Sequence, residues 1–337
     1  MSAITLSGDL IHYEVHGRGR PVILLHSWVG SWRYWVPTMQ QLAVKYRVYV
    51  PDLLGFGDSA HNPNHYTIDH QVQVLVDFME QMGFQKAGFV GHGLGALVTT
   101  AFARAYPDKA PRIMLVSAPL FDPGGLERRV PAARRPVEIS QAMATNFEGT
   151  IMSSSVRAAM LELQRSRQGD ETISSAAALA ALDDSLSKAP KHNPFTERDG
   201  LLSLTPEAML NRCFRRTDPI YEKLALDLPR TDMASIRTSV SDFDSGRFLD
   251  TIRLLPMPKI IVHGEDDPLL PVPTESVLNY LSVETEQIAP PVTIIAPDVR
   301  HFPMLEYERF SRLVNDFLEV PDLSTLEVKE RWKRRTR

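Results

Sequence analysis

The first 120 residues alternate apolar strand-like runs with amphipathic stretches, and this alternation restricts the fold more than any other feature. Residues 21–25 (PVILL) and 113–116 (IMLV) are typical of strands buried on both faces, and residues 46–50 (YRVYV) are rich in β-forming residues. Apolar residues recur at helical spacing after Thr67 and after Leu94. Strands that alternate with helices predict a parallel sheet covered on both faces.

The alternation stops after Pro119 and resumes at residues 259–262 (KIIV) and 292–296 (VTIIA), before a last amphipathic helix. The segment between them has helical patterns, among them residues 153–167 and 173–186, and few strand signals. We therefore predict an α/β core with an insertion. The predicted parts are a first part of the core at 1–119, a helical cap at 120–256, a second part of the core at 257–320 and a basic C-terminal tail at 321–337.

Composition excludes several classes of protein. Apolar residues make up 43% of the 337 residues and charged residues 23%, as in globular proteins, and no apolar run reaches the about 20 residues that a membrane crossing needs. The single cysteine, Cys213, rules out an intrachain disulfide and a cysteine zinc cluster. We expect a cytoplasmic protein, because no signal peptide is visible. The net charge of -4 argues against nucleic-acid binding.

One local charge anomaly stands at the C-terminus, where residues 329–337 (KERWKRRTR) hold six basic side chains. The simpler interpretation is a solvated chain end. The alternative is a tether for an acidic partner. The sequence does not indicate an oligomeric state.

Four polar segments follow predicted strands, at the edge where open α/β sheets place their ligands. They are 26–30 (HSWVG), 91–95 (GHGLG), 264–267 (GEDD) and 300–302 (RHF). Their order resembles the α/β-hydrolase superfamily with a helical cap, and is similar to its esterase, lipase and epoxide-hydrolase-like members. The resemblance implies an α/β-hydrolase fold, with a mostly parallel eight-stranded sheet flanked by helices.

The resemblance also implies roles for individual residues. Asp267 holds the position of the acid, in preference to Glu265 and Asp266, and His301 holds the position of the base. Such an Asp orients the imidazole, and the His moves protons. The backbone N–H groups of Trp28 and Leu94 would form the oxyanion hole. No metal or organic cofactor is implied.

The family's nucleophile elbow reads G-x-S-x-G, and here the chain departs from it. The flanking Gly91 and Gly95 are present, but position 93 is a glycine and has no side chain to attack a substrate. Glycine adopts the positive φ of this turn without strain. The substitution therefore fits a lost or altered mechanism and preserves the fold.

Four further residues are candidates for substrate binding: His26, Ser27, His92 and Tyr34. Supporting roles in the loops are the alternative for the two histidines. Ser27 stands where the family usually has glycine, which alters the geometry of that loop.

Three functional hypotheses follow. The first is a homologue without covalent catalysis that binds a small, apolar ligand under the cap, with or without acid–base chemistry by His301 and Asp267. The second is a hydrolase of carboxylic esters or related bonds whose nucleophile has been mutated. The third is a non-catalytic interaction protein that uses the scaffold or the basic tail. If the site is otherwise competent, Gly93→Ser is expected to raise ester hydrolysis.

Overall fold

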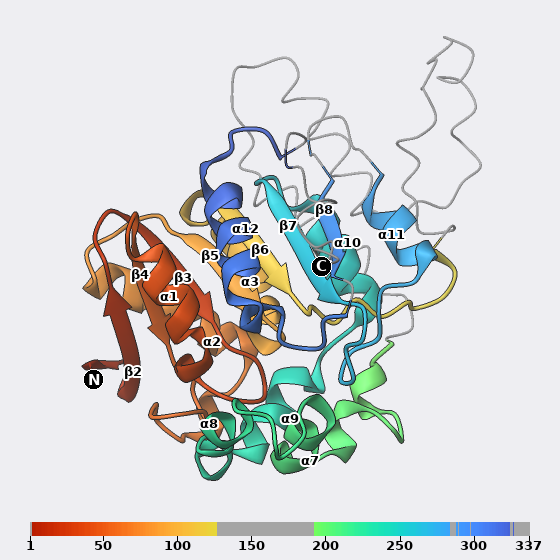
Figure 1. The fold of residues 1–337 in the computed structure, drawn as a ribbon, viewed down its shortest axis with the longest axis horizontal. Helices are drawn as coiled ribbons and strands as arrows, with labels where there is room; N and C mark the ends of the chain where they lie inside the picture. The colour runs from red at the N-terminus through yellow and green to blue at the C-terminus, as the bar shows by residue number, and fades with distance from the viewer. Residues whose placement is uncertain are drawn as a thin grey trace, which may run out of the picture. The chain divides into compact units, whose positions relative to one another are not determined.

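A single eight-stranded sheet organises the part of the chain that the computed structural model describes, which is residues 2–126, 192–283, 288, 290–296, 298–323 and 326 (Figure 1). The strand order is β1-β2-β4-β3-β5-β6-β7-β8, and neighbours from β4 to β8 run parallel. The predicted mostly parallel sheet is thus confirmed. The strands are β1 (Ser2–Leu6), β2 (Asp9–His16), β3 (Arg20–Leu25), β4 (Tyr46–Pro51), β5 (Gly88–His92), β6 (Arg112–Val116), β7 (Lys259–Gly264) and β8 (Val292–Ala296).

The antiparallel edge of the sheet was not predicted. β1 and β2 form a hairpin, and β2 pairs antiparallel with β4. The turn between them is Ser7-Gly8, and both residues have positive φ, at 50° and 91°. Two such residues twist a hairpin in the direction that strands prefer. In the sequence, this hairpin is indicated by a Ser-Gly pair that stands between two segments of alternating apolar and polar residues.

Helices flank the sheet and pack against one another in pairs. α1 contacts α12, and both lie over the face of the sheet turned toward the viewer in Figure 1, while α2 contacts α3. Thr67 caps α2 as the sequence predicts, since its side chain accepts a bond from the His70 amide. The described α-helices are α1 (Val36–Leu42), α2 (Ile68–Gln81), α3 (Leu94–Ala105), α7 (Pro206–Cys213), α8 (Tyr221–Ala225), α9 (Met233–Ser241), α10 (Ser245–Leu254), α11 (Glu275–Leu281) and α12 (Tyr307–Glu319). The described 3-10 turns are η1 (Trp32–Trp35), η2 (Pro63–His65), η3 (Pro107–Lys109), η6 (Pro194–Thr196), η7 (Leu201–Ser203), η8 (Leu228–Arg230) and η9 (Pro303–Leu305).

The chain divides into two compact units, residues 1–124 with 192–337 and residues 125–191. Helices α7 to α10 fall in the first unit and in the second half of the predicted cap. The predicted helices at 153–167 and 173–186 lie outside the described residues, as does the basic stretch 329–337. The cap at 120–256 and the tail at 321–337 therefore stay predictions. No helix among the described residues combines the length and apolarity that a membrane span requires.

The turn from β5 into α3 is built from glycines because the backbones there nearly touch. A Cβ on Gly91 would lie 2.2 Å from the carbonyl oxygen of Gly95, and one on Gly95 would lie 2.6 Å from that of Leu25. The Gly95 amide donates to the His26 carbonyl at 2.9 Å, which ties the start of α3 to the loop after β3. The glycine spacing read from the sequence therefore places two loops in contact.

A comparison within β5 tests this packing. We expect Gly91→Ala to lower the free energy of unfolding by at least about 2 kcal/mol, because its methyl group meets fixed backbone and Thr99. Gly88→Ala is the matched control, since its methyl group meets the end of the Leu318 side chain. Urea denaturation of both variants measures the difference. Equal losses of stability would contradict the close approach.

Candidate active site

His301 and Asp267 meet at the carboxyl ends of β7 and β8. Nδ1 of His301 lies 2.8 Å from Oδ2 of Asp267, and both side chains are fully buried. A carboxylate only accepts hydrogen bonds, so Nδ1 carries the proton and, in the neutral ring, Nε2 presents a lone pair. This is the arrangement in which a histidine accepts a proton from a neighbouring group.

The turn after β7 selects Asp267 from the three neighbouring acids. Its Oδ1 accepts from the amides of Leu269 and Leu270, at 2.9 and 3.1 Å, while Glu265 and Asp266 are exposed. Burial alone would raise the pKa of Asp267, but the charge and hydrogen bond of His301 outweigh it and lower this pKa to about 2. The carboxylate therefore stays ionised beside the imidazole.

Ser27 supplies the group that faces the free nitrogen of His301. Its Oγ lies 3.1 Å from Nε2 of His301, and both residues are fully buried. The contact joins loops that are 274 residues apart in the sequence. The sequence placed Ser27 among the substrate-binding candidates and offered one further signal, a serine where the family usually has glycine.

Gly93 lies directly beside this hydroxyl. Its φ of 52° lies in the region that favours glycine, and a Cβ built on it would lie 2.1 Å from Oγ of Ser27. The space above the elbow is therefore filled by the neighbouring loop. A serine side chain at position 93 would meet Ser27, so the expected gain in hydrolysis from Gly93→Ser alone stays a prediction that requires Ser27 to move.

Two backbone N–H groups beside the Ser27 hydroxyl belong to the candidate oxyanion hole. Trp28 follows Ser27 in the chain, and Leu94 is the first residue of α3, where a helix leaves its amides without intrahelical partners. Among the described residues, neither amide donates to another protein group. Their role in an oxyanion hole stays a prediction.

A chain of hydrogen bonds connects the backbones of Ser27 and His301. The Ser27 amide donates to the Tyr34 hydroxyl at 2.8 Å, and that hydroxyl donates to Nδ1 of His92 at 2.9 Å. Nε2 of His92 then donates to the His301 carbonyl at 2.8 Å, which also accepts from Oγ of Ser117 at 3.0 Å. These bonds fix the backbone of Ser27 relative to that of His301.

His26 braces the other side of the Ser27 loop. Its Nε2 accepts from the Leu53 amide at 2.9 Å, so Nδ1 donates to the Ser27 carbonyl at 2.8 Å. Burial lowers the pKa of His26, and burial followed by the nearby charge of His301 lowers that of His92 well below its ordinary value. Both rings are neutral supports with each nitrogen engaged. Substrate binding by His26, His92 and Tyr34 stays a prediction.

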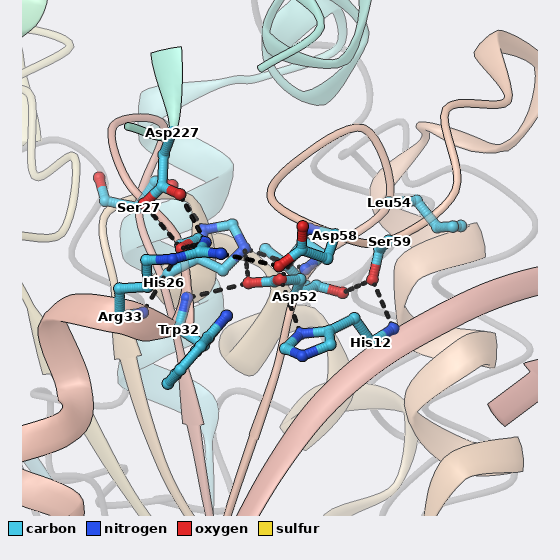
Figure 2. A network of polar contacts seen from close by, with 12 residues as sticks. His12, His26, Ser27, Trp32, Arg33, Asp52, Leu54, Asp58, Ser59 and Asp227 are labelled. Carbon is cyan, nitrogen blue, oxygen red and sulfur yellow. Dashed lines mark hydrogen bonds and ion pairs between the residues drawn. The ribbon is translucent and has the colours of Figure 1, made fainter. Parts of the chain in front are cut away.

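Asp52, in the loop after β4, anchors the loops around this site (Figure 2). Its carboxylate binds the ring of His12 at 3.0 Å and the amides of Trp32 and Asp58 at 2.9 and 3.0 Å. Arg33 bridges Asp58 and Asp227 at 2.9 and 2.6 Å. Asp52 and Asp58 therefore hold these loops together.

Cys213 cannot act as an alternative nucleophile. The thiol is buried, and burial followed by the charge of Asp267 raises its pKa well above the ordinary value. A thiol attacks only as the thiolate. The residue therefore stays inert at neutral pH.

Two clusters of described residues hold potential metal-ligating atoms within 4.8 Å of one another, Asp9 with His65 and His70, and His12 with Asp52 and Asp58. The second cluster is part of the loop network around Asp52. Neither contains His301 or Asp267, and neither is assigned a metal here.

The low pKa of Asp267 predicts a pH-dependent contribution to stability. The folded pKa of about 2 lies below the ordinary 3.8, so the contribution is complete above pH 4 and is lost as the pH falls toward 2. The full contribution is about 2 kcal/mol. We expect the stability difference between the native chain and Asp267→Asn to shrink by about 1 kcal/mol between pH 6 and pH 3.

Urea denaturation at the two pH values measures this difference. Asp266→Asn is the matched control, because this neighbouring carboxylate is exposed. An equal change in both variants would show that the effect does not come from the contact with His301.

Comparisons with known proteins identify the fold family. A family model described as alpha/beta hydrolase fold matches residues 20–306. A soluble epoxide hydrolase of Corynebacterium is 31% identical over 111 residues, which is 33% of this chain and 39% of that protein. The chain thus spans less than half the length of several curated relatives that it matches.

Two other similarities cover most of the chain. The 2-hydroxy-6-oxo-6-(2'-aminophenyl)hexa-2,4-dienoic acid hydrolase of Metapseudomonas resinovorans is 26% identical over 94% of this chain and 89% of that protein. A solved hydrolase of Pseudomonas aeruginosa superposes with a TM-score of 0.62 at 16% identity, covering 94% of this chain and 98% of the other. The family model spans most of the chain, and on this basis the protein belongs to the alpha/beta hydrolase fold family.

Proposed function

We propose that this protein hydrolyses a carboxylic ester or a related acyl bond in a small, apolar substrate. One observation carries the proposal: the buried Asp267 carboxylate holds Nδ1 of His301 at 2.8 Å, so that Nε2 is free to accept a proton. A scaffold that only binds a partner has no need of an ionised carboxylate buried against an imidazole, since burial of a charge is costly unless it is paired.

The oxyanion hole supports acyl chemistry in particular. Attack on an acyl carbon places negative charge on the carbonyl oxygen, and the amides of Trp28 and Leu94, which donate to no protein group among the described residues, are the donors that would bind it. The amides are part of the backbone, so the absence of a side chain at Gly93 does not remove them. Gly93 itself takes no part in bond formation.

Aromatic side chains around the site support an apolar substrate. The indole of Trp28 packs 5.4 Å from Phe195, and Phe302 packs 5.3 Å from Tyr34 and 5.1 Å from Phe214. Phe195 and Phe214 both come from the stretch predicted as the cap. Walls of this kind favour ligands with acyl chains or rings, and a few polar groups set their orientation.

Short p-nitrophenyl esters test the proposal. We expect the native chain to hydrolyse them, and His301→Gln to lower kcat/KM by at least about 10³-fold, because a glutamine side chain cannot accept the proton that His301 would take. His61→Gln changes an exposed histidine and serves as the control. A native rate no faster than that of His301→Gln would exclude ester hydrolysis by this site.

A further inference from the structure

We propose that Ser27, on the loop after β3, is the nucleophile of this enzyme, in place of a residue on the elbow. The inference rests on the proposed function, since it assigns the attacking atom of the same reaction. It begins from a steric exclusion. A Cβ at position 93 would lie 2.1 Å from Oγ and 2.9 Å from Cβ of Ser27, so a side chain at position 93 would require Ser27 to move from the place where it meets His301.

The hydroxyl of Ser27 has the partner that activates a nucleophilic serine. Oγ lies 3.1 Å from Nε2 of His301, and Nδ1 of the same ring lies 2.8 Å from Oδ2 of Asp267. Because Asp267 fixes the proton on Nδ1, the Ser27 hydroxyl donates to Nε2. A Ser–His–Asp arrangement is recognised by geometry and roles rather than by position in the sequence.

His301 is poorly placed to activate a water molecule directly, because the Ser27 hydroxyl already binds the lone pair on its Nε2. A water molecule attacking the substrate would have to give its proton to Nε2, and Ser27 already fills that position. The Ser27 proton is therefore the first one that His301 can take. A backbone fixed through Tyr34 and His26 keeps the hydroxyl in place.

The oxyanion hole suits attack from this loop. In hydrolases of this fold one donor is the amide of the residue after the nucleophile. Trp28 follows Ser27 in the chain, and among the described residues neither its amide nor that of Leu94 donates to a protein group. With Ser27 as the nucleophile, the amide of Trp28 therefore takes the place of that donor.

The reaction balances without a further reagent. Oγ of Ser27 bonds to the acyl carbon as its proton passes to Nε2 of His301, and the bond to the leaving group breaks as that group takes the proton from Nε2. Water then gives a proton to Nε2 and its oxygen attacks the acyl carbon. The acyl–Oγ bond breaks, the acid leaves, and Nε2 returns the proton to Ser27.

A fluorophosphonate probe tests the assignment on the native chain, so no variant has to fold. Attack by Oγ forms an oxygen–phosphorus bond and releases fluoride, and mass spectrometry locates the adduct. We expect a single label on Ser27. We also expect Ser27→Ala to take no label and to lose at least about 10³-fold in kcat/KM for p-nitrophenyl esters. Ser203→Ala, which changes an exposed serine on η7, is the control.

A swap of the two positions gives a second test. Gly93→Ser alone is expected to lower the melting temperature, because of the 2.1 Å conflict. The double variant Ser27→Gly/Gly93→Ser removes that conflict. We expect the fluorophosphonate to label position 93 in this variant, and we expect the variant to hydrolyse p-nitrophenyl esters. Stability of the single variant equal to the native chain would contradict the exclusion.

The outcomes separate this proposal from the proposed function. Loss of hydrolysis in His301→Gln but not in Ser27→Ala, or a label on another residue, would overturn the role of Ser27 and leave the hydrolase intact. A native chain that is labelled at Ser27 but cleaves no ester would keep the nucleophile and refute ester hydrolysis. A native chain that is not labelled and does not hydrolyse esters would refute both proposals.

Discussion

The close approach of the loop after β3 to the turn between β5 and α3 is the constraint on which the site depends. The Gly95 amide binds the His26 carbonyl at 2.9 Å, and neither Gly91 nor Gly95 has room for a Cβ. Two loops held this closely share one small volume above the elbow. With glycine at position 93, the Ser27 side chain fills that volume and meets His301. The identities of these two residues are therefore physically coupled, although 66 positions separate them.

Protonation in the site follows from burial and pairing. Asp267 stays ionised because His301 and two amides bind its oxygens, whereas burial keeps His26 and His92 neutral. The neutral rings each donate one hydrogen bond and accept one, so they connect loops without adding charge. Asp227 shows the opposite balance, since burial raises its pKa to about 6 in spite of Ser31 and Arg33.

Much of the fold was predictable because local patterns are repeated along the chain. Apolar runs marked the parallel strands, Thr67 marked the start of α2, and the glycines at 91 and 95 marked the elbow. The antiparallel pairing of β1 with β2 was missed, although residues 11–15 alternate as in a half-buried strand, because the turn that joins the two strands is the short Ser7-Gly8 pair. For the site, motif order indicated His301 and favoured Asp267 over its neighbours Glu265 and Asp266. The turn that binds Leu269 and Leu270 distinguishes them, and such a turn is a property of backbone geometry.

By itself, the sequence determined the sheet, the glycine turn and the absence of a side chain at position 93. These properties depend on residues that are near one another in the chain, or on the spacing of apolar residues and glycines along it. Only the tertiary structure decided what fills the space above Gly93 and which group faces Nε2 of His301. That contact joins residues 274 positions apart, and its 3.1 Å length depends on three loops held by Tyr34, His92 and His26. A sequence pattern shows that a serine replaces a glycine; the packed backbone shows where its hydroxyl lies.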